Sequence, residues 1–421
     1  MRILLSFYTD FHIHSPYSRA TSKAMLLPNL VESSKKTGLK ILGTGDILDS
    51  RWREYLKNHL VEEDEGVYTY KKDDNIFFIP TGEVEDNEGI HHLLLLSSIS
   101  SGEDLAFELE KYMKKTLKQY GGRPIIPLKG NELVEIVHRY NGLIGPAHAF
   151  TPFKSIFRSN RYRKLSGSYL NQSKKIDFVE LGLSANSNMA DRIKELWNYT
   201  FLTNSDSHSP HPSKIGRECN LISLNTITFD EIRFAIKNIK GRKIEKNIGL
   251  DPRLGKYYSS FCFKCRRRVK FVENIKAPYD EKNIYFEKAE EHIIIKSVIE
   301  TNVRCPVCRG LIKSGVNNRI KSLATTKERN KQRVEYINIV PLVEIITTIL
   351  GIKGTNTKTV MKEYNNLTSN VDTEIAILTT TPIETIKKEN KIVGEIIDKM
   401  RTNQLEINEG GGGIYGKILL P

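Results

Sequence analysis

The sequence predicts an α/β protein with a largely parallel sheet, followed by a small cysteine-containing domain and a helical carboxyl-terminal domain. Over residues 1–250, apolar strand-like runs alternate with helical patterns, which is typical of a parallel sheet, open or closed into a barrel. Two Cys-x2-Cys pairs then occur in a basic segment, residues 251–333, and the patterns over residues 334–421 are helical. A stretch rich in Gly and Pro near residue 250 supports the first boundary.

Length and composition agree with a globular protein of about three domains. The chain has 421 residues, of which 39% are hydrophobic and 27% are charged, and a domain commonly has about 150 residues. We expect no membrane span, because no run of about 18 apolar residues occurs, and no removed signal peptide, because His12 and His14 come too early. Five cysteines are too few for a disulfide scaffold, so a reducing, cytoplasmic location is expected.

Strands and helices are expected at defined places in the first domain. Three helical patterns, each followed by a glycine that ends it, lie at residues 26–37, 102–120 and 131–140. Thr228 and Glu231 have the spacing of a capping box before a further amphipathic helix. Strand-like apolar runs lie at residues 3–8, 39–44, 76–81, 92–96, 143–147, 176–181 and 200–205.

Histidines and carboxylates lie at the ends of these expected strands. His12 and His14 form an H-x-H whose side chains face the same side of an extended segment, and Asp206 and His208 have the same spacing. The carboxyl ends of parallel strands share one face, so we expect these groups to gather there. Neutral imidazoles and carboxylates in one cluster are ligands for Zn²⁺, Mn²⁺ or Fe²⁺.

The order of the motifs resembles the PHP (polymerase and histidinol phosphatase) family. The matching segments are HIHSPYS, TGD, TGE, HHLLLL, PAHAF and NSDSHS, with TGD standing where many members have TDH. The resemblance implies a distorted seven-stranded β/α barrel with a metal centre that hydrolyses phosphoesters. Carried over by position, its metal ligands are His12, His14, Asp46, Glu83, His92, His148, Asp206 and His208.

Four positions carry an alternative. Asp46 replaces the histidine of TDH, which keeps a ligand but changes its type. His91 is the alternative to His92, since neighbours on a strand face opposite sides. Arg19 falls near a further metal-site position of the family and has phosphate binding as its other role. Glu180, at the end of the sixth strand, either supports the site or is structural.

The resemblance also implies the catalytic roles. Two or three divalent ions (Zn²⁺, Mn²⁺ or Mg²⁺) would convert a bound water to hydroxide at neutral pH and neutralise phosphate oxygens. Glu83 would bridge two ions. Asp206 would bind one ion and would orient or deprotonate the water.

Cys262, Cys265, Cys305 and Cys308 predict a structural Zn²⁺ site. The two pairs are separated by 39 residues, and four thiolates satisfy tetrahedral zinc without an open position. The alternative, a pair of disulfides, requires a secreted protein. Cys219 remains as a small buried hydrophobic residue.

Positive charge is concentrated around these cysteines. The whole chain has a net charge of +14, and residues 251–333 hold 20 Lys and Arg against 9 Asp and Glu, a net of +11. Arg266, Arg267, Arg268 and Lys270, with aromatic residues at 257, 258, 261, 263 and 271, are therefore expected to bind nucleic acid. The alternatives are a solvated surface for the charge and a small zinc-module core for the rings.

The remaining sequence signals are negative. The segment GIKGTNTKT at 351–359 lacks the glycine before lysine that the ATP-binding phosphate loop requires, so we expect no nucleotide cofactor. We find no motif for a sliding-clamp partner, and we expect no membrane partner.

Along nearly its whole length the chain resembles one PHP subfamily, endonuclease Q. The supporting segments are GTGDI, PAHAF, NSDSH, IGRE, PLVEII and the closing GIYGKI, together with the two cysteine pairs. The resemblance implies a DNA repair nuclease that acts on damaged DNA and cuts the phosphodiester 5′ of deaminated bases (uracil, hypoxanthine, xanthine) and of abasic sites. One alternative is a small-molecule phosphomonoesterase of the histidinol-phosphatase type, which leaves residues 251–421 without a task. The other is a non-enzymatic nucleic-acid-binding protein, which conflicts with the nearly complete ligand set.

Overall fold

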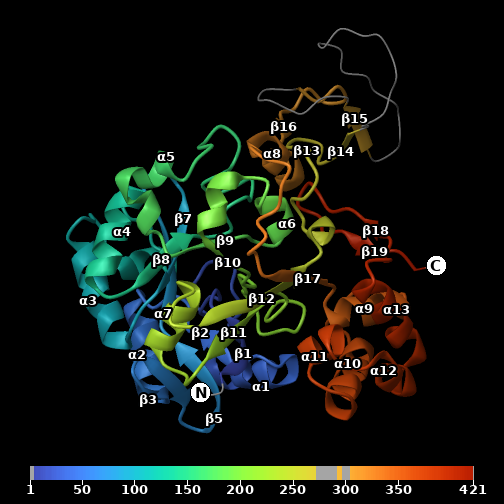
Figure 1. Ribbon diagram of the computed structural model, residues 1–421, viewed down its shortest axis with the longest axis horizontal. Helices are drawn as coiled ribbons and strands as arrows, with labels where there is room; N and C mark the ends of the chain where they lie inside the picture. The colour runs from blue at the N-terminus through green and yellow to red at the C-terminus, as the bar shows by residue number, and fades with distance from the viewer. Residues whose placement is uncertain (1–3, 272–291, 296–303, 421) are drawn as a thin grey trace.

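The computed structural model describes residues 4–271, 292–295 and 304–420, and its largest element is an eight-stranded sheet (Figure 1). The strand order is β17-β12-β11-β1-β2-β5-β4-β3. β2 is parallel to both β1 and β5, whereas β1 is antiparallel to β11, so the sheet is mixed and not wholly parallel. Its strands are β1 Leu5–Asp10, β2 Ile41–Gly43, β3 Leu60–Asp64, β4 Val67–Tyr70, β5 Asp73–Ile79, β11 Cys219–Leu224, β12 Lys243–Leu250 and β17 Glu335–Ile339.

Two smaller sheets complete the α/β part. β6 (Thr81–Glu85), β7 (His91–Leu95) and β8 (Leu143–Pro146) form an antiparallel sheet, and β9 (Phe178–Glu180) pairs in parallel with β10 (Thr200–Leu202). Each of the seven strand-like runs in the sequence overlaps a strand. The expectation of strand and helix alternation is therefore confirmed, although the strands are distributed over several sheets.

The helices of this part are set by recognisable end signals. Thr228 accepts a hydrogen bond from the backbone N–H of Glu231 at 3.2 Å and so starts α7, as the capping pattern predicts. α1 ends at Gly38, where φ is +93° and a Cβ would lie 2.6 Å from Oγ1 of Thr373, so only glycine fits there. The helices are α1 Leu27–Thr37, α2 Ser50–His59, α3 Ile99–Glu110, α4 Gly130–Arg139, α5 Ser166–Tyr169, α6 Ser187–Ala190 and α7 Phe229–Ile236.

Two of the sequence expectations for helices need correction. The helical pattern over 102–120 ends at Glu110, whose carboxylate accepts a hydrogen bond from the backbone N–H of Leu117 at 2.8 Å as the chain turns. The segment from residue 334 begins with β17 and not with a helix. Because β17 pairs in parallel with β12, it belongs to the edge of the main sheet, and Tyr336 and Ile339 are buried there.

The apolar core follows the pleat of the strands. Ile41 of β2 belongs to one hydrophobic cluster and its neighbour Leu42 to another, because successive residues of a strand face opposite sides. Helix α7 contributes Phe229 and Ile232 to the first of these clusters, and α1 contributes Leu30 to the second. The rigid positions of the strand ends, which carry the polar residues discussed below, follow from this packing.

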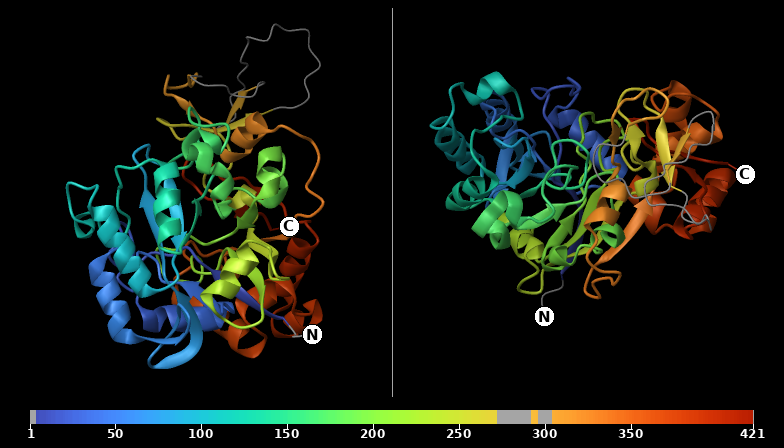
Figure 2. Two further views of the ribbon diagram at one scale, coloured as in Figure 1. Left: turned by 60° about the vertical axis from the view of Figure 1, so that its left-hand side comes forward. Right: turned by 90° about the horizontal axis from the view of Figure 1, so that it is seen from above.

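The cysteine-containing segment is an insertion between β12 and β17. Its strands are β13 Phe261–Cys262, β14 Arg268–Phe271, β15 His292–Ile295 and β16 Ile312–Lys313, and α8 (Val316–Leu323) follows them. In both Figure 1 and Figure 2 this segment projects from one end of the α/β part. Lys270 lies in β14, but its side chain and that of Phe271 lie outside the described residues.

Five helices and a closing hairpin form the carboxyl-terminal region. α10 and α11 pack against α1 of the α/β part. The helices are α9 Leu342–Ile349, α10 Lys358–Asn370, α11 Glu374–Thr379, α12 Ile383–Glu389 and α13 Lys391–Arg401, and the hairpin strands are β18 Ile407–Asn408 and β19 Lys417–Ile418. None of the helices in the described part of the chain has the length and hydropathy needed to cross a membrane.

The glycine run near the end of the chain is held by backbone hydrogen bonds. Four consecutive glycines, Gly410 to Gly413, would by pattern alone predict a flexible turn. Instead the backbone N–H of Gly410 donates to the carbonyl of Arg253 at 2.7 Å, and that of Gly413 donates to the carbonyl of Lys256 at 3.0 Å. A Cβ at Gly410 would lie 2.4 Å from the carbonyl oxygen of Gly255, so glycine permits this close approach.

Candidate metal centre and active site

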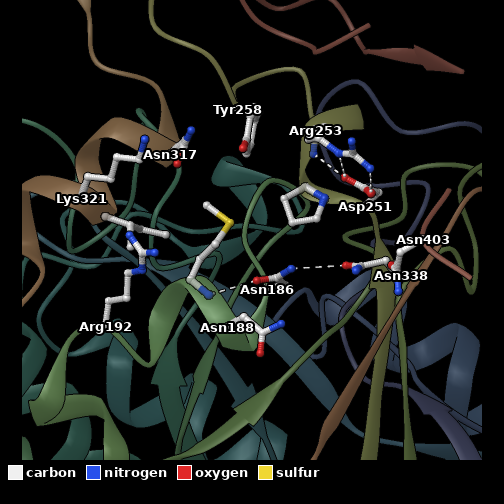
Figure 3. Close-up of a pocket in the computed structure, with 13 residues that line it drawn as sticks. Asn186, Asn188, Arg192, Asp251, Arg253, Tyr258, Asn317, Lys321, Asn338 and Asn403 are labelled. Carbon is white, nitrogen blue, oxygen red and sulfur yellow. Dashed lines mark hydrogen bonds and ion pairs between the residues drawn. The ribbon is translucent and has the colours of Figure 1, made fainter. Parts of the chain in front are cut away.

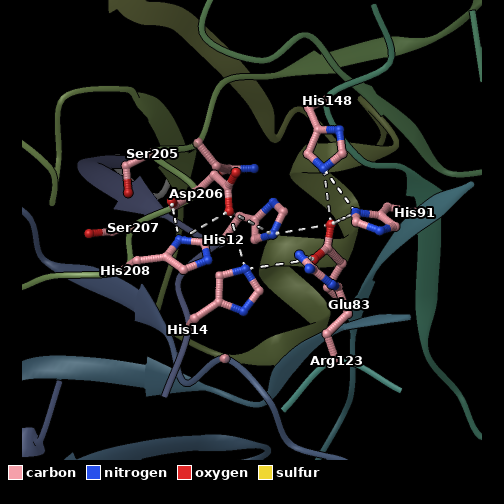
Figure 4. A network of polar contacts seen from close by, with 12 residues as sticks. His12, His14, Glu83, His91, Arg123, His148, Ser205, Asp206, Ser207 and His208 are labelled. Carbon is pink, nitrogen blue, oxygen red and sulfur yellow. Dashed lines mark hydrogen bonds and ion pairs between the residues drawn. The ribbon is translucent and has the colours of Figure 1, made fainter. Parts of the chain in front are cut away.

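Residues from five places in the α/β part meet in one polar cluster (Figure 4). His12 and His14 follow β1, Glu83 is in β6, His91 opens β7, His148 follows β8, and Asp206 and His208 follow β10. A backbone bridge between Ile13 and Ser207 aligns the H-x-H and D-x-H segments side by side. The strand-end placement predicted from the sequence therefore does bring these residues together.

The cluster contains two groups of three ligand atoms. His12, His14 and Asp206 form one group, and Glu83, His91 and His148 form the other; within each group the ligand atoms lie within 4.8 Å of one another. His14 Nε2 lies 3.2 Å and His12 Nε2 lies 3.6 Å from Asp206 Oδ1. This matches the expectation that both imidazoles of the H-x-H face one point.

Glu83 joins the two groups. Its Oε1 lies 2.8 Å from His91 Nδ1 and 3.0 Å from His148 Nε2, while its Oε2 lies 3.6 Å from His14 Nε2. The carboxylate is fully buried between the histidines. Its two oxygens can therefore serve two neighbouring cations, which is the geometry required of a bridging ligand.

The donor set fits divalent cations. Nε2 of His12 is buried and has no hydrogen-bond partner among the described residues. A buried polar atom without a partner is costly in a native protein, and a bound metal ion would satisfy this one. Five neutral imidazoles and two carboxylates suit Zn²⁺, Mn²⁺ or Fe²⁺.

Two carboxylates orient the histidines from behind. Glu180 lies 3.0 Å from Nδ1 of His12, and Asp46 lies 3.0 Å from Nδ1 of His14, so the Nε2 atoms point toward the centre. Asp46 also accepts hydrogen bonds from the backbone N–H and the hydroxyl of Ser15, both at 2.6 Å. The structure thus corrects the expectation of Asp46 as a ligand: both its oxygens are occupied by His14 and Ser15.

Of the two neighbouring histidines in β7, His91 lies in the cluster and His92 does not. His92 is fully buried on the other face of the strand, 3.0 Å from Asp86 Oδ2 and 2.8 Å from the hydroxyl of Tyr169. Because successive residues alternate between the faces of a strand, only one of the pair can face the centre. The placement of His92 by motif position is corrected to His91, the alternative.

Three site residues have backbone conformations that are rare outside glycine. φ is +46° at Asp46, +31° at His148 and +48° at Asp206. Such conformations cost about 1–3 kcal/mol each and cluster at functional sites, where the surrounding structure maintains them. Asp206 is held in this way with its side chain 32% exposed, so it is the carboxylate of the cluster that is accessible from the cavity described below.

The electrostatics of the cluster favour bound positive charge. Burial by itself lowers the pKa of His14, but Asp46, Asp206 and Glu83 outweigh it and raise that pKa to about 9. Burial opposes ionisation of Glu83 and Asp206, yet the surrounding histidines lower the pKa of both carboxyls. The carboxylates are ionised at neutral pH, and divalent cations would supply the balancing charge while releasing the histidine protons.

Two further residues border the cluster. His208 lies 3.7 Å from Asp206 Oδ1, and its ring is 4.3 Å from that of His14, centre to centre. Arg123 donates to Glu83 Oε2 at 3.1 Å from a loop that follows Gly121 and Gly122. A Cβ at Gly122 would lie 2.1 Å from Asp46 Oδ2, so this glycine lets the loop approach.

Arg123 was missed in the sequence, where a cation placed directly after a Gly-Gly pair was the available signal. Arg19, which we considered for metal or phosphate binding, is exposed and contacts none of the cluster residues in the described part of the chain. Arg123 therefore occupies the position near the ligands for which we had considered Arg19.

The four predicted cysteines form a second metal-ligand cluster. Their Sγ atoms all lie within 4.8 Å of one another, with Cys262 and Cys308 at 3.4 Å and Cys265 and Cys305 at 3.8 Å. A Cβ at Gly310 would lie 3.1 Å from Sγ of Cys262, so this glycine leaves room at the cluster. Cys219 is buried in β11, away from the other four.

Among the basic residues next to the cysteines, Arg266 is exposed, with its guanidinium 5.0 Å from the centre of the half-exposed Phe263 ring. Arg267 is half-buried, and Arg268 donates to Asn408 in the closing hairpin at 3.1 Å. Phe261 is fully buried, which fits a core role for that ring. The binding of nucleic acid by these residues stays a prediction.

Two cavities of the described residues lie where the α/β part meets the segments that follow residue 250. One of about 510 Å³ opens onto the metal-ligand cluster and is lined by His91, His148, Asp206 and His208, together with Tyr415 of the carboxyl-terminal segment. The other, of about 430 Å³, shares none of these residues and lies between α6, α8 and β17 (Figure 3). Five asparagines face this second cavity: Asn186, Asn188, Asn317, Asn338 and Asn403.

Comparison with known proteins identifies the family. Residues 341–404 match the family of the MJ0043 C-terminal domain. The crystal structure of the lesion-specific endonuclease PfuEndoQ from Pyrococcus furiosus is 39% identical, with a TM-score of 0.85, over 99% of this chain and 96% of that one. The chain belongs to the endonuclease Q family.

Two further relatives agree with this assignment. An endonuclease Q complex with a 27-mer duplex containing an abasic lesion is 39% identical, with a TM-score of 0.87, over 99% of this chain and 97% of that one. The uncharacterized protein MJ0043 of Methanocaldococcus jannaschii is 38% identical over 292 residues, which are 68% of this chain. The matched part spans only 33% of that longer relative.

Proposed function

We propose that this chain is a metal-dependent DNA repair endonuclease that hydrolyses the phosphodiester 5′ of deaminated bases (uracil, hypoxanthine and xanthine) and of abasic sites. The observation that carries the proposal is a histidine and carboxylate cluster opening onto a cavity, in a chain that aligns end to end with endonuclease Q. That the aligned relative was solved with an abasic duplex supports damaged DNA as the substrate.

The α/β part, residues 1–250, is proposed to be the PHP-type barrel, and the seven strand-like runs are proposed to supply its strands. Its centre would hold two or three Zn²⁺, Mn²⁺ or Mg²⁺ ions on His12, His14, Glu83, His91, His148, Asp206 and His208. The Cys262, Cys265, Cys305 and Cys308 cluster would hold a structural Zn²⁺, because four thiolates leave no open position.

The residues of the centre divide the chemistry among them. Bound divalent ions lower the pKa of a water molecule and neutralise phosphate oxygens. Asp206, the partly exposed carboxylate, would orient the attacking water or accept its proton. Glu83 holds the two ligand groups at a fixed separation, and Arg123 adds positive charge on the side of Glu83 Oε2. His208, one-third exposed, borders the same space.

Affinity for the duplex is assigned to the basic segment. Arg266, Arg267, Arg268 and Lys270 belong to the stretch of net charge +11, and Lys and Arg that neutralise DNA phosphates supply most sequence-independent affinity. A damaged base costs less to extrude from the duplex than a paired one. The lesion nucleotide would then enter the cavity beside the metal cluster.

A cleavage assay tests the proposal. End-labelled duplexes with one uracil, one hypoxanthine, one abasic site or no lesion are incubated with the protein and Mg²⁺ or Mn²⁺. We expect one product that ends directly 5′ of each lesion and none from undamaged DNA. Asp206→Ala should abolish cutting but bind DNA nearly as well as the natural protein, while the exposed Asp74→Ala serves as the matched control. Intact lesion DNA combined with turnover of phosphomonoesters would refute the proposal.

A further inference from the structure

The cavity that opens onto the metal cluster has a second polar wall, built from cations. Lys214 and Arg217 lie in the loop after Asp206 and His208, Lys256 lies after β12, and Tyr415 comes from the carboxyl-terminal segment. None of these four residues belongs to the metal-ligand groups. They therefore need an explanation of their own.

Tyr415 lies at the centre of this wall. Arg217 donates from Nη1 to the Tyr415 hydroxyl at 3.2 Å, and Nζ of Lys214 lies 5.0 Å from the centre of the Tyr415 ring. Nζ of Lys256 lies 5.9 Å from the same ring and 5.1 Å from that of Tyr257. Three positive side chains are thus gathered around one phenol.

Arg217 connects the wall to the metal cluster. The guanidinium is buried and donates from Nε and Nη2 to the carbonyl of Ser205, at 3.2 Å and 2.9 Å. Ser205 directly precedes Asp206, the partly exposed carboxylate of the cluster. The third guanidinium nitrogen, Nη1, is the one that holds Tyr415.

Within the described part of the chain, no ion pair neutralises either of the two lysines. Among residues 4–271, 292–295 and 304–420, neither the Lys214 nor the Lys256 ammonium forms an ion pair. Glu344 of α9 lies near Lys214 and Arg217, and burial raises the pKa of its carboxyl more than these two cations lower it. Asp206 and Glu180 are the carboxylates that line the cavity itself. Burial raises the pKa of Tyr415, but Arg217, Lys214 and Lys256 outweigh it and lower that pKa, so positive charge dominates the wall.

The carboxyl-terminal segment reaches the cavity because it lies along residues 253–259. The backbone N–H of Gly416 donates to the carbonyl of Leu254 at 2.8 Å, and that of Ser259 donates to the carbonyl of Gly410 at 3.0 Å. A Cβ at Gly416 would lie 2.6 Å from the carbonyl of Arg253. The glycines thus permit the close approach that delivers Tyr415 to the wall.

We propose that Lys214, Arg217, Lys256 and Tyr415 form an anion subsite that holds the DNA phosphate on the 3′ side of the lesion nucleotide. The inference rests on the proposed function. Cleavage on the 5′ side places the scissile phosphate at the metal cluster, and the nucleotide in the cavity carries its second phosphate on its 3′ side. The ammonium groups of Lys214 and Lys256 line the same cavity, form no ion pair with the residues that the structure describes, and supply the complementary charge.

The carboxyl-terminal region thereby becomes part of the active site. α9 supplies Glu344 behind Lys214 and Arg217, and the closing hairpin supplies Tyr415. A phosphomonoester of a small molecule lacks the second phosphate, so the subsite favours a nucleic-acid strand over such substrates.

Removing the charge from either partner tests the subsite. Two lesion duplexes are compared, one natural and one with a neutral methylphosphonate at the phosphate 3′ of the lesion, and binding is measured by fluorescence anisotropy with Ca²⁺ in place of Mg²⁺. We expect the methylphosphonate to weaken binding by the natural protein about tenfold, as for a lost charge-assisted hydrogen bond. Lys214→Met combined with Lys256→Met should weaken binding of the natural duplex similarly, and the methylphosphonate should then add little.

The controls separate the subsite from general attraction. Lys57→Met removes a surface lysine that does not line the cavity, and it should leave the response to the methylphosphonate unchanged. A methylphosphonate several nucleotides away should affect the natural protein and the double variant equally. Equal weakening of both proteins by the 3′ methylphosphonate would overturn the subsite.

Tyr415 is tested by two variants, each first checked to have the zinc content and the melting temperature of the natural protein. Tyr415→Phe keeps the ring between the lysines and loses only the Arg217 contact, so KM for lesion DNA should rise less than in Tyr415→Ala, with kcat nearly unchanged in both. A fall in kcat without a change in KM would contradict a phosphate-holding role. If the natural protein binds lesion and undamaged duplexes equally, the proposed function itself fails. If it prefers lesion duplexes but the methylphosphonate has no effect, only the anion subsite fails.

Discussion

Glu180 offers the sharpest test of how the metal centre is organised. Its carboxylate accepts from the backbone N–H of His148 at 2.7 Å and from the amide of Asn204 at 2.8 Å, and it lies 3.0 Å from Nδ1 of His12. In Glu180→Gln one carboxylate oxygen becomes an NH2 group. In either orientation of the glutamine amide, its NH2 group faces an N–H donor, and two donors cannot form a hydrogen bond with each other.

The size of the effect follows from these contacts. The amide of Asn204 cannot simply turn over, because its Oδ1 accepts from the backbone N–H of Phe11 at 3.0 Å and from Asn220 at 3.2 Å. One buried donor is left without a partner, which costs about 1–3 kcal/mol of stability. Loss of a residue that orients a ligating histidine lowers metal affinity by about 10–100-fold.

The charge of Glu180 also affects the pKa of His12. Burial lowers the pKa of His12, but Glu180, Asp206 and Glu83 raise it further than burial lowers it. Loss of the Glu180 charge lowers that pKa and, by itself, would ease metal binding, because the metal requires a neutral imidazole. Weaker binding in Glu180→Gln would therefore show that the lost orientation of His12, together with the lost attraction of the carboxylate for the cation, outweighs the easier deprotonation of the imidazole.

Mn²⁺ affinity measured calorimetrically at pH 8 checks this expectation, with Glu245→Gln, which alters a half-buried carboxylate in β12 that accepts from Ser6, as the matched control. Unchanged or tighter Mn²⁺ binding in Glu180→Gln would refute the orienting role of Glu180.

Three further predictions concern other parts of the chain. Cys305→Ser should lower the zinc content and the melting temperature, because one of four thiolates is lost, whereas Cys219→Ala should keep the zinc; equal zinc in the two variants, measured by atomic absorption, would contradict the site. His91→Asn should weaken Mn²⁺ binding, whereas His92→Asn should leave Mn²⁺ binding nearly intact. His92→Asn should instead lower the free energy of unfolding by about 2–3 kcal/mol, because His92 forms hydrogen bonds with buried Asp86 and Tyr169. The reverse pattern would restore His92 as the ligand. Burial raises the pKa of Glu374 to about 7. Between the ordinary carboxyl pKa and this value, Glu374 carries a proton in the native state but not in the unfolded state. The free energy of unfolding therefore falls as pH rises through that window, by up to about 3 kcal/mol. Glu374→Gln should remove this fall between pH 5 and pH 8 in urea unfolding, and an unchanged slope would show that another group causes it.

The chemistry of the site was readable from the sequence because it depends on residue type and short-range spacing. His12 with His14 and Asp206 with His208 each face one side of an extended segment, and the structure brings both pairs to one point. The four cysteines likewise converge, since each C-x2-C pair is a local turn that supplies two ligands. The strand runs were predictable for the same reason, because apolar patterning over a few residues reports burial.

The choice among neighbouring residues was decided only by the tertiary structure. Whether His91 or His92 faces the centre depends on the register of β7 with β6, a pairing between separate segments of chain. Asp46 is assigned a supporting role and not that of a ligand, because its second oxygen accepts a hydrogen bond from Ser15. Residues 335–339 form a strand because β12 offers a free edge for pairing, and no local pattern encodes that edge.

Long-range contacts also decide what the carboxyl-terminal segment does. Tyr415 is separated from Arg217 by 198 positions in the chain, and their contact depends on glycines that let two backbones approach. The sequence by itself determined which side chains are available for metal, zinc and phosphate chemistry, because those capacities reside in single residues and short motifs. The tertiary structure determined which of them meet, because that depends on pairing register and close packing between distant segments.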